Sequence, residues 1–196
     1  ARRSAVDDDF EENSSSMNQI FGLPAHPLMV HIPIILIPLL ALLAIAFIAR
    51  PAWRPMMSVP LATLAVVTLL GTLLAASSGE SLRDRVQRSD LVRAHAEQGD
   101  QLRIIGGLFC LAVLGTVLLE NSERRGWRRL RLPAGRQLLV LASAATILIA
   151  VAATTWDVRA GHSGAKAVWS DSSRYRTASA PSQADVPMST PTPAAP

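Results

Sequence analysis

The chain has 196 residues, of which 49% are hydrophobic and 17% charged, and its formal net charge is +4. This composition, with a positive mean hydropathy, is too apolar for an ordinary soluble domain and is typical of a small helical membrane protein. The single cysteine, Cys110, excludes an internal disulfide, and without a C-x-x-C-H motif there is no c-type haem attachment. The arginines flank apolar segments, where basic residues meet lipid headgroups, so we expect no nucleic-acid binding.

The chain begins with residues 1–20, which are polar and acidic and predict a disordered N-terminal tail. They contain too little apolar surface to offset the entropy lost on ordering. Residues 1–27 also lack the apolar core of a secretory signal, so we expect no cleavable signal peptide there.

Four apolar segments follow, at residues 28–49, 57–78, 104–119 and 138–156. A helix needs roughly 20 apolar residues to cross the bilayer core, and each segment predicts one such helix. The third is short, but Leu102 and the stem of Arg103 extend it by snorkelling. The prediction is an all-α integral membrane fold, an antiparallel bundle of four transmembrane helices within a domain of residues 21–169.

The connections between these segments predict how the bundle is oriented. Residues 50–56 form a tight turn, and residues 120–136 carry six arginines. Basic connections stay in the cytoplasm, so we expect both on the inner side of a bacterial plasma membrane and both termini outside. Residues 170–196 are rich in Ser, Ala, Pro and Thr and predict a disordered C-terminal tail.

The four histidines are expected to gather at one end of this bundle. His26 and His31 stand at the start of the first helix, and His95 precedes the third. His162 follows the fourth, after a glycine, Gly161, that is placed to cap that helix. In an antiparallel bundle these helix ends share one membrane face, which is therefore expected to be the extracytoplasmic one.

Imidazole is a common metal ligand and an axial ligand of haem iron, so all four histidines are candidate cofactor ligands. We expect haem b, with His31 as the preferred ligand because it lies deeper in the span than His26. Its partner on the opposite side of the haem is His95 or His162. A copper or zinc ion is the less favoured cofactor, and its candidate ligands are His31, His95 and His162. The alternative for each histidine is an interfacial residue hydrogen-bonded to a neighbour or to water.

Small and acidic residues near the histidines leave two interpretations open. Gly99 and Gly106 leave room for a macrocycle on one face of the third helix, but close helix packing in lipid selects the same residues. Four acidic residues either orient imidazoles or form ion pairs with nearby arginines; they are Glu80, Glu97, Asp100 and Asp157.

Three motifs resemble the pattern of a widespread bacterial family of small four-helix membrane proteins, domain of unknown function 2231. They are GLPAHPLMVHIPI at residues 22–34, AHAEQGD at 94–100 and RAGHSGAKAVW at 159–169. The matching positions are His26, Pro27, His31, Pro33, His95, Gly161, His162 and Gly164. The chain departs from the pattern at Ala165 and Lys166, and it lacks a further downstream histidine. The resemblance implies the fold, and redox company, because some relatives are joined to Rieske-type domains.

These observations favour a membrane-embedded electron-transfer subunit that binds haem b or a metal through its histidines. The alternative is a non-catalytic accessory subunit of a larger membrane or respiratory complex. Either protein is a redox carrier or an accessory subunit rather than a stand-alone enzyme. The sequence has no phosphate loop, H-E-x-x-H or G-x-S-x-G motif. Its expected partners are membrane lipids and that larger complex.

Overall fold

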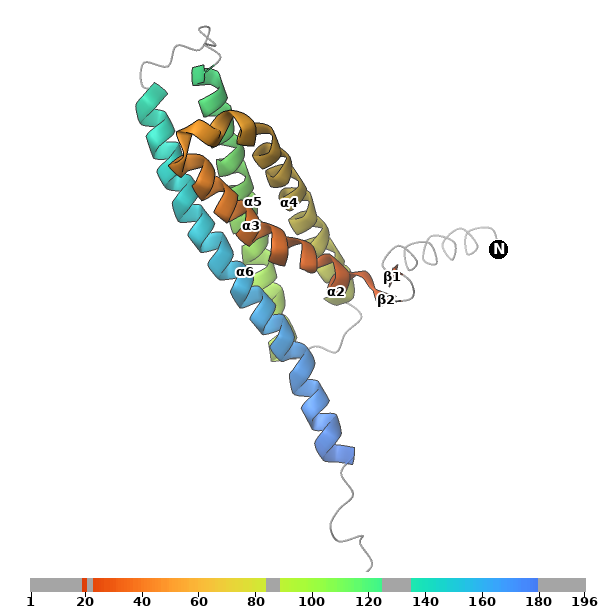
Figure 1. Ribbon diagram of the computed structural model, residues 1–196. Coiled ribbons are helices and arrows are strands. Elements are labelled where there is room, and N and C mark those ends of the chain that lie inside the picture. The colour runs from red at the N-terminus through yellow and green to blue at the C-terminus, as the bar shows by residue number, and fades with distance from the viewer. Residues whose placement is uncertain (1–18, 21–22, 84–88, 125–134, 180–196) are drawn as a thin grey trace, which may run out of the picture.

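The computed structural model describes residues 19–20, 23–83, 89–124 and 135–179 (Figure 1). Four helices in it are long and apolar enough to cross a membrane, which confirms the predicted all-α membrane bundle. Most of the predicted N-terminal tail, residues 180–196 of the predicted C-terminal tail and residues 125–134 of the arginine-rich connection lie outside the described residues.

The first span is built from two short strands and two consecutive helices. Strand β1 (Gln19–Ile20) pairs antiparallel with β2 (Leu23–Pro24), and α2 (Ala25–Met29) and α3 (His31–Ala49) follow. The break between the helices is slight, because the Val30 amide still donates to the His26 carbonyl at 3.0 Å. Helix α3 ends where Arg50, with φ −121° and ψ 84°, precedes Pro51, since proline disfavours the helical conformation in the residue before it.

Three longer helices complete the bundle. After the turn η1 (Pro51–Trp53) come α4 (Arg54–Arg83), α5 (Asp90–Arg124) and α6 (Gly135–Ser179). The Ser89 hydroxyl caps α5 by accepting from the Val92 amide at 3.2 Å. The helices outrun the apolar segments because apolarity marks what lipid covers, whereas a helix continues until something breaks it. Gly161 does not end α6, so its predicted capping role was wrong, and α6 runs past residue 169 to Ser179.

The core lies along the inner faces of the four helices. Ile37 and Phe47 of α3, Ala65 of α4, Phe109 of α5 and Ala153 of α6 are fully buried within it. Large apolar side chains also cover the outer faces, as a lipid environment requires; Leu42, Leu118 and Leu148 are examples.

Gly106 lies inside this packing. A Cβ added there would meet the Ile37 side chain at 3.6 Å and the Thr72 side chain at 3.7 Å. Side chains therefore fill the face that the sequence suggested for a macrocycle, and close helix packing accounts for Gly106. Gly99 has no such neighbour within 4 Å.

A buried arginine ties the helices together at the end opposite the histidines. Arg54 pairs with Glu120 of α5 at 2.8 Å, and these side chains are only 17% and 9% exposed. The same guanidinium donates to the carbonyls of Phe47 at 3.1 Å and Ile48 at 2.8 Å, which satisfies the last turn of α3. In mid-bundle, the Thr116 and Thr146 hydroxyls join α5 to α6 at 2.9 Å.

Candidate metal centre at the histidine end

The structure places the four histidines on α2, α3, α5 and α6, and it brings two of them together in the bundle interior. The rings of His26 and His95 have centroids 6.1 Å apart and planes inclined at 63°. Both side chains are half-buried, whereas His31 and His162 are exposed. The pair is therefore His26 with His95, and not the pair with His31 that the depth argument favoured.

The His26 ring rests on the end of α4. Its Nδ1 lies 3.1 Å from the Ala75 carbonyl oxygen and 3.1 Å from the Ser78 Oγ. The Ser78 hydroxyl itself donates to the Ala75 carbonyl at 2.8 Å. Gly79 lies against the ring, since a Cβ added there would be 2.9 Å from Cε1 of His26.

The His95 ring rests on α6 in the same way. Its Nδ1 lies 3.1 Å from the Ser163 Oγ, and the Ser163 hydroxyl donates to the Ala160 carbonyl at 2.9 Å. A Cβ added at Gly164 would be 2.9 Å from Cε1 of His95. Each inward histidine thus has a serine at Nδ1 and a glycine against Cε1.

The two seats share one sequence pattern that our reading of the sequence missed. Both follow Ala-x-x-Ser-Gly, at residues 75–79 and 160–164. The histidine comes from the start of one helix, and the pattern lies towards the end of the helix that follows it in the chain. The α3–α4 and α5–α6 hairpins therefore repeat one local arrangement. The repeated five-residue pattern was the available signal, but it is too short to stand out before the two seats are seen.

The hydrogen bonds fix the tautomer of both rings. Each serine hydroxyl has its hydrogen committed to a carbonyl, so its oxygen can only accept from Nδ1. Nδ1 therefore carries the proton in both neutral rings, and Nε2 keeps the lone pair that a metal needs. Among the described residues, no hydrogen bond reaches Nε2 of either ring.

The other two histidines face away from the pair. The His31 Nδ1 lies 2.7 Å from the Pro27 carbonyl oxygen one turn earlier, a local contact. Five residues separate His31 from His26, about 140° around a helix, so only one of them can point inward. Within the described part of the chain, no three His, Cys, Asp or Glu side chains are placed to hold one ion. The proposed trio His31, His95 and His162 is therefore not assembled.

The acidic side chains near this end do not orient the imidazoles. Glu80 pairs with Arg103 at 2.9 Å, and Asp100 lies 3.6 Å from the same guanidinium. Asp157 is 3% exposed, and its Oδ1 has no hydrogen-bond partner in the described structure. Serines and backbone carbonyls take the orienting role for which we considered carboxylates.

The family model described as "Predicted membrane protein (DUF2231)" matches residues 22–176. The chain belongs to this family. The matched region of this DUF2231 protein contains all four histidines and both Ala-x-x-Ser-Gly seats. No curated protein and no solved structure matches the chain.

Proposed function

We propose that this protein is a membrane electron-transfer subunit that holds a redox-active metal centre between His26 and His95. The observation that carries the proposal is the pair of inward rings, each bound through Nδ1 to a serine and each left with a free Nε2 lone pair. A metal-ligating histidine commonly donates its other ring nitrogen to an oxygen in this way.

The spacing of the rings supports a shared metal. Imidazole nitrogens bind metals at about 2 Å, and the ring centroid lies about 1.1 Å behind the nitrogen. Two rings on opposite sides of one ion would thus have centroids about 6 Å apart. The observed centroid separation of 6.1 Å matches that arrangement.

A set of two histidines suits some centres better than others. Haem b needs only two axial protein ligands, and copper accepts imidazole together with ligands from water or a partner. Structural zinc needs four ligands from the protein, so two histidines support it less. Copper fits between the rings as they stand, whereas haem requires the helices around them to separate. Copper is therefore favoured over haem b in this geometry.

The test is metal analysis and visible absorption of protein purified after expression with added copper and haem precursor. We expect about one metal per chain, as a single ion bridges the two rings. His26→Ala and His95→Ala should each abolish binding. His31→Ala and His162→Ala are matched controls that should retain it. A Soret band would identify haem, and copper without that band would identify the ion. Wild-type protein with neither metal nor Soret band would refute the proposal.

The accessory-subunit alternative has an observation of its own. Each inward ring joins two helices, His26 linking α2 to α4 and His95 linking α5 to α6. Asparagine can imitate the Nδ1–H donor but offers nothing in place of Nε2. If the histidines only join helices, His26→Asn should keep wild-type thermal stability and no variant should change metal content. If they hold a metal, His26→Asn should lose it.

A further inference from the structure

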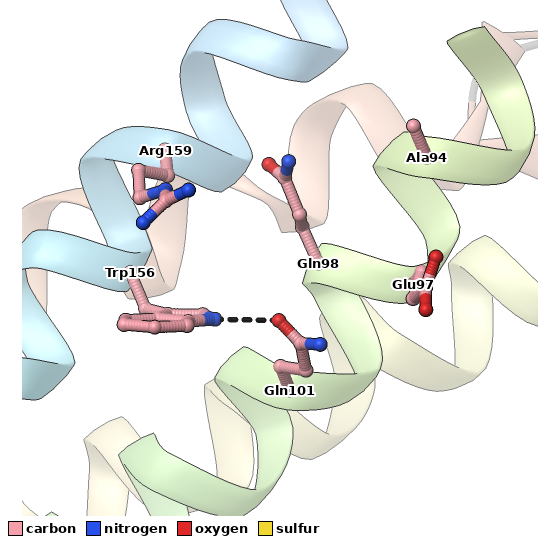
Figure 2. Close-up of a pocket in the computed structure, with 6 residues that line it drawn as sticks. All are labelled: Ala94, Glu97, Gln98, Gln101, Trp156 and Arg159. Carbon is pink, nitrogen blue, oxygen red and sulfur yellow. Dashed lines mark hydrogen bonds between the residues drawn. The ribbon is translucent and has the colours of Figure 1, made fainter.

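A second site lies between α5 and α6, close to where the apolar part of α6 ends. It is a cavity of about 280 Å³ whose lining residues are Ala94, Glu97, Gln98, Gln101, Trp156 and Arg159. Figure 2 shows Trp156 and Arg159 extending from α6 and the two glutamines from α5. No histidine lines the cavity, so it is separate from the candidate metal centre.

The walls of the cavity are held by direct contacts. The Trp156 indole donates to Gln101 Oε1 at 2.8 Å, which joins α6 to α5. The Arg159 guanidinium lies 5.1 Å from the centroid of the Trp156 ring, within the range of a cation–π interaction. Tryptophan is enriched at the membrane–water interface, so the cavity lies at the depth of lipid headgroups.

Three polar groups at this cavity have unmet bonding capacity. Gln98 Oε1 is buried and accepts no hydrogen bond. Arg159 and Glu97 form no ion pair with each other or with another described residue. A complementary ligand therefore needs an anion for Arg159, and a cation with N–H donors for Glu97 and the Gln98 oxygen.

We infer that this cavity binds the headgroup of a phosphoethanolamine lipid. The phosphate pairs with the Arg159 guanidinium, and the primary ammonium donates to Gln98 Oε1 and the Glu97 carboxylate. A choline headgroup has no N–H to donate, and a phosphoglycerol headgroup has no cation. On the same face of α5, one and two turns beyond Gln101, Ile104 and Leu108 are 61% and 53% exposed and offer apolar surface to the acyl chains.

The test is a titration of delipidated full-length protein with short-chain phosphoethanolamine, phosphocholine and phosphoglycerol lipids, followed by native mass spectrometry. We expect phosphoethanolamine lipid to bind at least about tenfold more tightly than the other two. Gln98→Leu should abolish that preference, and Arg159→Gln should weaken the binding of all three. Gln137→Leu and Arg136→Gln, both exposed at the far end of α6, are matched controls that should change nothing.

Three outcomes would overturn the inference. One is equal affinity for the three lipids, and another is an unchanged preference in Gln98→Leu. The third is soluble glycerophosphoethanolamine binding as tightly as the lipid, which would point to a free metabolite as the ligand. Gln98→Glu guards against a folding defect in the leucine variant, because it keeps the acceptor oxygen and should retain the preference. Loss of the preference in Gln98→Glu would also contradict the inference.

Discussion

Gly79 and Gly164 determine how closely α4 and α6 approach the two inward histidines. At both positions an added Cβ would lie 2.9 Å from a ring carbon, closer than such atoms pack. The ring is short and is held through its Nδ1, so it has little freedom to move aside. These glycines therefore serve a contact with a side chain, and both lie within continuous helices.

Alanine at either glycine should displace the ring beside it. We expect Gly79→Ala and Gly164→Ala each to lower the free energy of unfolding by about 1–3 kcal/mol through overpacking. Gly99→Ala is the matched control. It has open space around it and should raise stability by about 0.5–1 kcal/mol, because alanine favours helix over glycine. Unfolding in mixed micelles measures all three, and equal effects would show that the ring contacts are unimportant.

The buried ion pair at the opposite end makes a second residue-scale prediction. Glu120→Gln leaves the Arg54 charge without its counter-ion in a site that is largely shielded from solvent. We expect a loss of about 2–5 kcal/mol in the free energy of unfolding. Glu80→Gln removes the partner of Arg103, a more exposed pair, and should cost less than about 1 kcal/mol. Similar losses in the two variants would contradict the role assigned to Arg54.

The gathering of histidines at one end could be predicted from the sequence, but the choice of the inward pair could not. The end follows from the number of spans, since successive helices reverse direction. Whether His26 or His31 points inward depends on the rotation of the first span about its axis. That rotation is set by packing against α4, including the contact of Ile32 with Gly71, which no local pattern records.

At the scale of elements, α3 and α4 approach each other through a small residue. A Cβ added at Gly71 would collide with the Ile32 side chain, whereas one added at Gly115 of α5 would meet nothing within 4 Å. Without a hydrophobic driving force between helices in lipid, such close approach is a main source of attraction.

Substitutions at these two glycines should separate packing from helix propensity. Gly71→Ala should destabilise the bundle by about 1–3 kcal/mol, and Gly115→Ala should leave stability unchanged or raise it by up to about 1 kcal/mol. Trimming the opposing side chain in the double variant Gly71→Ala/Ile32→Ala should recover part of the loss relative to the sum of the single variants. Strict additivity, measured by the same unfolding assay, would show that these residues do not interact.

The apolar segments predicted which elements exist and not how far they extend. Helix α5 begins at Asp90, well before the apolar segment that starts at Ile104, because Ser89 caps it and nothing between these residues breaks a helix. Helix α6 passes through Gly161 and Gly164 for a similar reason: contacts with α5 and α3 stabilise the helix around them. The Arg54–Glu120 pair also escaped prediction, since its members lie on helices far apart in the chain.

At the scale of the whole molecule, the antiparallel bundle fixes which surfaces share a side of the membrane. Ala52 and Glu123 are exposed at one end, and Ser89 and Ala165 at the other. We propose that the arginine-bearing end faces the cytoplasm, in keeping with the usual bias of basic residues.

Cysteine labelling tests this arrangement, since the native Cys110 is buried and should not react. Ala52→Cys and Glu123→Cys should react with an impermeant maleimide only in inverted vesicles. Ser89→Cys and Ala165→Cys should react only from outside the cell. A complete exchange of the two patterns would reverse the proposed orientation but keep the fold. Labelling of Ser89→Cys and Ala165→Cys from different sides would contradict the four-span bundle.

Helix α6 continues beyond the ends of the other helices (Figure 1). At about 1.5 Å per residue, the stretch from Gly164 to Ser179 carries the backbone about 22 Å beyond the level of the His95 seat. A helix of that length is a spacer with a definite height. Whatever follows residue 179 therefore starts at a set distance from the lipid, over the same membrane face as the paired imidazoles.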